Sequence, residues 1–276
     1  MTKSSDYAAV IGIDWGDQKH AIAICCDDQM ELEWLDQTPE EIDLWAVALR
    51  QRFGGQPIAV CLEQSKGALI YALMKYDFLV LLPINPSQLA SYRDAMKPGR
   101  PKDDPTDAEL LADFASKHLA RLKVLKPDDE LTRRLRQLCE DRRSLVDHRT
   151  KLTNSLKSRL KQYFPQALQL LKDLRTELSC ELLRRWSSLE KMQQANVSDI
   201  EKCIKLYSGP NYKKLLDRLQ DCLASKPLTS DRAIVDSGAL LVRSLARQLK
   251  QSVLSIEEYD QAIAAAMESH ADKGIF

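Results

Sequence analysis

The hydrophobic pattern changes near Pro127, and this change constrains the fold more than any other feature of the 276-residue sequence. Up to about residue 125, short apolar runs alternate with stretches of helical period, bounded by Gly, Pro and Asp. Beyond Pro127, leucines recur three, four or seven residues apart through long stretches with few glycines. We therefore expect an α/β domain over residues 1–126 and a helical region over residues 127–276.

The first domain opens with runs typical of a β-meander and continues with strand–helix units. The turn-like pair Gly16-Asp17 separates the first two runs, as in a hairpin. The expected strands are residues 8–14, 20–26, 30–34, 57–62 and 78–84, and the expected helices are 39–52, 67–76 and 86–96. This order predicts one mixed sheet with helices on its faces.

Two long helices dominate the second half. Residues 131–164 carry a leucine stripe, and residues 231–267 carry a second apolar stripe. Breaks near residues 208–210 and 226–227 mark shorter helices between them. We expect the long helices to pair antiparallel as a coiled coil, with the shorter helices as an insertion.

Charge is distributed unevenly along a chain whose formal net charge is zero. Residues 1–97 carry 8 Lys and Arg against 14 Asp and Glu, so the remainder has an equal excess of positive charge. Residues 131–164 hold ten Lys and Arg but only three acids. A basic helix suits phosphate binding, with Arg142, Arg143 and Arg149 as candidates, although a solvated helical face is an equally good interpretation.

No apolar run approaches the roughly 18 residues that span a bilayer, and the first residues lack a signal-peptide pattern. The seven cysteines are scattered without a CxxC pair, which is typical of reduced thiols. We therefore expect a cytoplasmic protein with no membrane partner.

Four acids stand where a metal site would need them. Asp14 and Glu63 each end an apolar strand. Asp104 is expected to cap a helix with Pro105 at its first position, and Asp107 follows on the same face. Carboxylates in this arrangement can hold two Mg²⁺ ions, one activating a nucleophile and one stabilising a leaving oxygen. Each acid, taken alone, could instead be a turn, strand-end or capping residue.

Three blocks of the sequence carry a resemblance to a known family. VIGIDWGDQKHAIAIC, CLEQSKGALIYAL and VLLPINPSQLASYRDAMKPGRPKDDPTDAELLADF resemble consecutive blocks of the DEDD transposases of IS110- and IS1111-type insertion sequences. The resemblance covers residues 8 to about 165 and implies an RNase H-like, RuvC-like fold. The family's four acids fall on Asp14, Glu63, Asp104 and Asp107. It also implies Mg²⁺ dependence, DNA and bridge RNA as partners, and synapsis by a homo-oligomer, either a dimer or a tetramer.

The basic residues beside the acids, Lys97, Arg100 and Lys102, are candidates for holding the scissile phosphates. Members of this family continue into a second catalytic domain that supplies a nucleophilic serine. The sequence ends at Phe276, about where that domain should begin, and residues 175–255 exceed the expected linker. We therefore expect this chain alone to bind nucleic acid without completing strand exchange.

The expected function is thus that of a Mg²⁺-dependent transposase or site-specific DNA recombinase. The alternative is a nucleic-acid-binding or regulatory fragment without complete recombinase activity. Actin-like ATPases and sugar kinases also open with an IGID-x-G segment, but they need later glycine-rich loops for the nucleotide. This chain has nine glycines, none of them clustered after Gly99, which disfavours that class.

Overall fold

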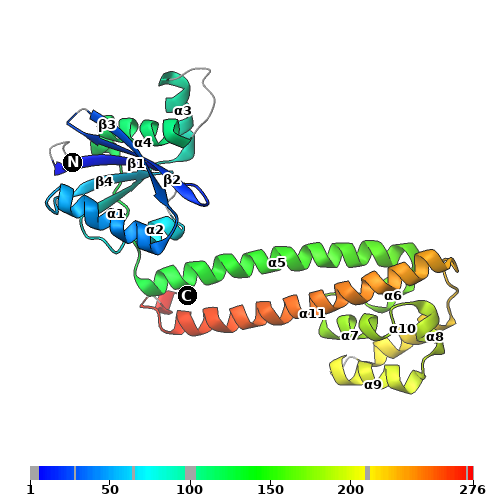
Figure 1. Cartoon of the computed structure of the whole chain (residues 1–276). Coiled ribbons are helices and arrows are strands. Elements are labelled where there is room, and N and C mark those ends of the chain that lie inside the picture. Colours follow the sequence, from blue (N-terminus) through cyan, green and yellow to red (C-terminus); the bar gives the residue numbers. More distant parts are fainter. Residues whose placement is uncertain are drawn as a thin grey trace. The chain divides into compact units, whose positions relative to one another are not determined.

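The computed structural model describes residues 6–27, 29–63, 66–96, 104–208, 212–271 and 273–275. The chain divides into two compact units, Met1–Pro127 and Asp128–Phe276. The first is built around a β-sheet and the second is made of helices (Figure 1). Each unit is described separately below.

The first unit contains a five-stranded mixed sheet. Its strands are β1 (Ala9–Asp14), β2 (Lys19–Cys26), β3 (Gln29–Asp36), β4 (Ile58–Leu62) and β5 (Leu79–Pro83). They lie in the order β3-β2-β1-β4-β5. β1, β2 and β3 form the antiparallel meander, whereas β4 runs parallel to β1 and β5 runs parallel to β4. The mixed sheet predicted from the sequence is confirmed, and its order is consistent with an RNase H-like domain.

Helices cover both faces of this sheet (Figure 1). On one face, α1 (Pro39–Arg52) and α2 (Ala68–Leu73) pack against side chains such as Ile11 and Ile22. On the other face, α3 (Pro86–Met96) and α4 (Asp104–His118) pack against Ala59 and Cys61. A short 3₁₀ turn, Leu119–Arg121, follows α4. All five residues of β4 are buried, as expected for a strand covered on both faces.

Helix α4 lies unusually close to the sheet. A Cβ atom placed on Gly12 of β1 would lie 2.2 Å from the carbonyl oxygen of Ala108 and 2.5 Å from the amide nitrogen of Ala112. Ala108 and Ala112 also pack with Ala21 and Ala23 of β2. Because the residues facing each other here are mostly Gly and Ala, the backbone of α4 rests almost directly on the sheet. This contact sets the height at which α4 crosses β1.

The second unit is organised around two long helices, α5 (Glu130–Tyr163) and α11 (Arg232–Glu268). Three side-chain contacts show that they run antiparallel. Thr132 Oγ1 lies 2.9 Å from His270 Nε2 just beyond α11, Arg142 pairs with Asp260, and Arg159 Nη2 donates to Ser237 Oγ at 2.8 Å. Figure 1 shows the two helices side by side along their length. The antiparallel pair predicted from the sequence is confirmed, while coiled-coil packing stays a prediction.

Among the residues that the structure describes, five shorter helices lie between α5 and α11 in the sequence. They are α6 (Gln166–Leu170), α7 (Glu177–Arg185), α8 (Leu189–Gln194), α9 (Val197–Ser208) and α10 (Tyr212–Ala224). They share one hydrophobic core with the C-terminal half of α5 and the N-terminal half of α11. A final 3₁₀ turn spans Lys273–Ile275.

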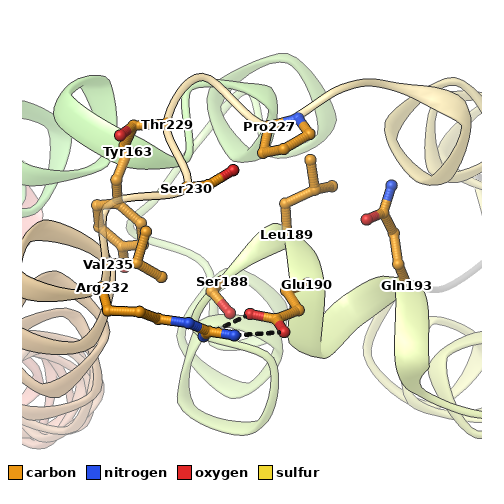
Figure 2. Close-up of a pocket in the computed structure, with 10 residues that line it drawn as sticks. All are labelled: Tyr163, Ser188, Leu189, Glu190, Gln193, Pro227, Thr229, Ser230, Arg232 and Val235. Atoms are coloured by element: carbon orange, nitrogen blue, oxygen red, sulfur yellow. Dashed lines mark hydrogen bonds and ion pairs between the residues drawn. The ribbon is translucent and has the colours of Figure 1, made fainter.

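Polar contacts fasten this insertion to the long helices. The Tyr163 hydroxyl, at the end of α5, donates to the carbonyl oxygen of Ser187 at 2.6 Å. Figure 2 shows the pocket beside this contact, where Arg232 in the first turn of α11 reaches Glu190 of α8. The guanidinium group makes two hydrogen bonds to that carboxylate, at 2.7 and 2.9 Å. The pair therefore ties the start of α11 to α8.

Among the helices that the structure describes, none combines the length and the apolar character needed to cross a lipid bilayer.

The contact at Gly12 generates the first prediction. We expect Gly12→Ala to destabilise the first unit by about 1–3 kcal/mol or more, because the added methyl group meets backbone atoms that cannot move aside. Thermal unfolding followed by circular dichroism should show a lower midpoint for this unit. Gly274→Ala is the control, because no atom lies within 4 Å of its added Cβ. An unchanged midpoint for Gly12→Ala would contradict the close approach of α4.

Candidate active site

Asp14 and Glu63 lie at equivalent positions on neighbouring parallel strands. Asp14 is the last residue of β1, and Glu63 directly follows β4. Ile13 and Leu62 are paired in the β1–β4 register, so the two acids leave the sheet side by side at its carboxyl edge. Each acid is partly exposed. The geometry of parallel pairing thus brings together two carboxylates that are 49 positions apart in the sequence.

Asp104 joins them from the other side of a pocket. It is the first residue of α4, so the helix begins one residue earlier than expected. A pocket of about 180 Å³ is lined by Asp14, Glu63 and Asp104 together with Ile13, Trp15, Leu62, Leu69 and Ile70. Three of the four predicted acids therefore surround one cavity. Its remaining walls are mostly apolar.

A buried histidine holds the turn that follows Asp14. His20 is fully buried, and its Nδ1 accepts a hydrogen bond of 3.2 Å from the amide of Gly16. Nδ1 must then be unprotonated, so Nε2 carries the proton and donates it to the side-chain oxygen of Gln37. Burial lowers the pKa of His20, and the bond to Gln37 opposes this effect. The neutral ring therefore fixes the backbone beside Trp15 and Asp14.

Asp107 lies elsewhere than the sequence analysis expected. Only 1% of its surface is exposed, and it does not line the pocket. Nη2 of Arg93, on α3, lies 2.6 Å from Asp107 Oδ1 in an ion pair, although the two groups are not aligned as a hydrogen bond. The neighbouring Ala108 packs against Gly12, which sets the rotation of α4 and turns Asp107 into the protein. The ion pair with the arginine offsets the free-energy cost of burying this carboxylate.

The donor set around the pocket suits Mg²⁺ by its chemistry. Carboxylate oxygens are the hard ligands that this ion prefers, and Mg²⁺ commonly keeps several waters while using one or two carboxylates and substrate phosphates. Among the described residues, no three His, Cys, Asp or Glu side chains lie close enough together to ligate one ion directly. Asp14, Glu63 and Asp104 are the residues that would hold such an ion.

The basic candidates fall into two groups. Lys97, Arg100 and Lys102 lie outside the residues that the structure describes. Arg142, Arg143 and Arg149 lie on α5 in the second unit.

These three arginines have different surroundings. Arg142 is engaged by Asp260 of α11. Arg143 is 80% exposed and lies 3.7 Å from Asp147. Arg149 is half-buried, and its positive charge helps to lower the pKa of Asp173. Of the three, Arg142 is therefore the least available to a phosphate.

Sequence reasoning missed two functional neighbours of the acids. Arg93 pairs with a residue on a different helix, and no motif or spacing in the sequence marks it. Gln37, at the end of the meander, bonds the ring of His20. Its position just after the third strand was visible, but the sequence alone does not show that it faces a histidine.

Comparison with known proteins identifies a transposase family. Residues 11–165, more than half of the chain, match the model of the family DEDD_Tnp_IS110, described as a transposase. The matched segment contains all four acids and the whole of α5.

Two curated relatives extend the similarity. The chain is 26% identical over 275 residues to a "Mini-circle putative transposase for IS117" of Streptomyces coelicolor, covering 96% of this chain and 66% of the relative. It is also 26% identical over 199 residues to the "Putative transposase y4uE" of Sinorhizobium fredii, covering 70% of this chain and 55% of that protein. The chain thus spans less than two thirds of the length of these relatives.

The pair of Arg93 and Asp107 generates a prediction about stability. Arg93→Ala removes the cation that is paired with a buried carboxylate, so we expect a loss of about 3 kcal/mol in the free energy of unfolding. Urea denaturation measures this loss. Lys19→Ala is the matched control, because it breaks an exposed pair with Asp36 worth about 1 kcal/mol or less. If the double variant Arg93→Ala/Asp107→Ala recovers none of the loss, the ion pair is not its cause.

The buried histidine generates a prediction about pH. The folded-state pKa of His20 is lowered from 6.5, so the unfolded chain binds the proton more readily. The stability that this group contributes is complete above about pH 6.5 and is lost as the pH falls below that value. Urea denaturation between pH 7.5 and 5.5 should show this decline in the wild type and a shallower one in His20→Gln. Equal slopes in the two proteins would contradict the assignment.

Proposed function

This chain belongs to the DEDD_Tnp_IS110 transposase family, and from that membership we propose that it processes DNA at the pocket lined by Asp14, Glu63 and Asp104. The observation that carries the proposal is the meeting of these acids from two parallel strand ends and a helix start. We propose Mg²⁺ as the cofactor. Bound there, it would activate an attacking oxygen and neutralise charge on the phosphate.

The side chains of the site have separate parts in this proposal. Asp14 and Glu63 lie at the sheet edge and would hold the cation there. Asp104 approaches from α4, whose height over the sheet is set by the Gly12 contact. Ile13, Leu62, Leu69 and Ile70 provide apolar walls, which limit the water around the reacting phosphate and strengthen electrostatic interactions inside the pocket.

Asp107 has two competing roles. The family pattern makes it a fourth metal-binding acid, whereas the structure pairs it with Arg93. Asp107→Asn separates the two, because it keeps the shape of the side chain and removes the charge. Loss of DNA cleavage with unchanged stability would favour the ligand role. Loss of stability together with retained cleavage would favour the role of partner to Arg93.

The partners proposed for the whole protein follow from the family. We propose that it acts on the ends of an insertion sequence and on target DNA, guided by a bridge RNA, as a homo-oligomer. Arg142, Arg143 and Arg149 on α5, with Lys97, Arg100 and Lys102 near the acids in the sequence, are the proposed phosphate contacts. Of these, exposed Arg143 is the best placed to reach a ligand.

The test of the proposed function is metal-dependent cleavage of DNA. The purified chain is incubated with its DNA sites, its RNA and Mg²⁺, and nicked products are separated on denaturing gels. We expect Asp14→Ala, Glu63→Ala and Asp104→Ala each to lower the rate about 100-fold or more, since a lost metal site costs several kcal/mol of transition-state stabilisation.

Asp17→Ala is the matched control for this experiment. It removes an exposed acid from the turn after Asp14, and Asp17 does not line the pocket. Its cleavage rate should equal that of the wild type. Wild-type rates in the three pocket variants would refute the proposed site, whereas nucleic-acid binding without any Mg²⁺-dependent cleavage would favour the binding or regulatory alternative.

A further inference from the structure

A basic groove lies in the helical unit. It is a pocket of about 410 Å³ between α5 and the loop that joins α6 to α7. Thr153 and Lys157 line it from α5, and Lys172 and Arg175 line it from the loop. Leu168, Leu171 and Leu174 also line it, the last two of them buried. The groove therefore combines an apolar base with a basic rim.

Two cations of α5, Arg149 and Lys157, lie on the helix face that carries Thr153, and of these three residues Thr153 and Lys157 line the groove. Arg149, Thr153 and Lys157 are spaced four residues apart, so they lie on the same face of the helix. The Thr153 hydroxyl donates to the carbonyl oxygen of Arg149 at 2.8 Å and is thus held against the helix. From Arg149 to Lys157 the helix rises about 12 Å, at about 1.5 Å per residue.

Asp173 shapes the opposite wall. Its carboxylate accepts two hydrogen bonds from the Arg175 guanidinium group, both 2.9 Å, and a third from the Arg175 amide. Bonding by Arg175, with a smaller contribution from the charge of Arg149, holds the pKa of Asp173 below its ordinary value. The acid is therefore ionised at neutral pH and largely satisfied by Arg175, which leaves the other cations of the groove uncompensated.

Lys157 and Lys172 are these uncompensated cations. Both are exposed, and within the described segments neither makes an ion pair or a hydrogen bond. Some other cations of this unit are paired with nearby acids. Arg136 pairs with Asp128, and Lys202 pairs with Asp199. Two free ammonium groups that line one groove repel one another, so an anion bound there would relieve that repulsion.

The lining indicates what kind of anion fits. No aromatic side chain is among the residues that line the groove, so unpaired bases would find nothing to stack on. The stretch of α5 from Arg149 to Lys157 spans about three to four base steps, at one phosphate per strand about every 3.4 Å. Lysines recognise phosphates as point charges and carry no information about base sequence. These features favour the outside of a double helix.

We propose that this groove binds the phosphodiester backbone of double-helical nucleic acid through Lys157 and Lys172, with Arg149 extending the contact along α5. The inference rests on the proposed function, because it takes nucleic acid to be the substrate class of the protein. It adds a site, between α5 and the helical insertion, that binds a duplex independently of its base sequence. DNA and RNA duplexes share the recognised chemistry.

The experiment measures binding of 20-base-pair DNA and RNA duplexes of the same sequence to the whole chain. Fluorescence anisotropy is recorded between 0.05 and 0.3 M salt for the wild type and for Lys157→Ala/Lys172→Ala. We expect the slope of log affinity against log salt to fall by about 0.9 for each phosphate that the variant no longer neutralises. At 0.1 M salt this corresponds to roughly 10-fold weaker binding per phosphate. The duplex, DNA or RNA, whose affinity falls more between the wild type and the variant is the one whose phosphates the groove binds.

The matched control is Lys202→Ala/Lys205→Ala on α9. It removes the same charge from the same unit, but these lysines are paired with Asp199 and Glu201. An equal loss of affinity in this control, or an unchanged slope in the groove variant, would overturn the proposal. Lys157→Arg/Lys172→Arg keeps the charges and should bind as the wild type does.

Failure of the groove is distinguishable from failure of the proposed function. The same variants are assayed for Mg²⁺-dependent DNA cleavage that requires Asp14. Unchanged duplex binding in the groove variant, alongside cleavage that Asp14→Ala abolishes, would refute the groove and leave the proposed function standing. Salt-sensitive duplex binding that disappears in the groove variant, without any cleavage in the wild type, would support the groove and refute the proposed catalysis.

Discussion

The close contact between β1 and α4 is the constraint on which the rest of the α/β unit depends. Because Gly12 has no side chain, the backbone of α4 approaches the sheet at Ala108 and Ala112. This contact sets both the height and the rotation of the helix. The height brings Asp104 to the edge where Asp14 and Glu63 end their strands, and the rotation turns Asp107 inward toward Arg93. The absence of a side chain at Gly12 thus places Asp104 and Asp107, only three positions apart, in different environments.

Much of the α/β unit could be predicted from sequence because its information is local. Apolar runs mark where β1 and β4 end, and parallel pairing then places Asp14 beside Glu63. Pro105 marks the start of α4 and hence the position of Asp104. The environment of Asp107 could not be predicted, because it depends on which face of α4 meets Gly12 and on an arginine from a separate helix. Periodicity shows that a helix has a buried face but does not identify its neighbours.

In the helical unit, the sequence likewise shows where positive charge lies but not which charged side chains are available to a ligand. The excess of Lys and Arg along α5 is plain in the sequence, but their availability is decided by acids far away in the chain. Arg142 meets Asp260, 118 positions later, and this pair joins the two long helices rather than facing a ligand. Lys157 and Lys172 come from different elements and are brought to one groove only by the fold of the insertion. Counting charges therefore identifies a basic helix, whereas the structure shows which of its cations are available.

The antiparallel pairing of α5 and α11 has a consequence for how such a unit can change in evolution. Thr132 near the start of α5 lies beside His270 just after α11, so the polypeptide leaves and re-enters the hairpin at the same end. The helical insertion sits at the other end, where Arg159 meets Ser237. Matched additions or deletions of whole turns in both helices would lengthen or shorten the arm while leaving each end intact. The length of the hairpin can therefore change while the packing of the helical insertion at its far end is preserved.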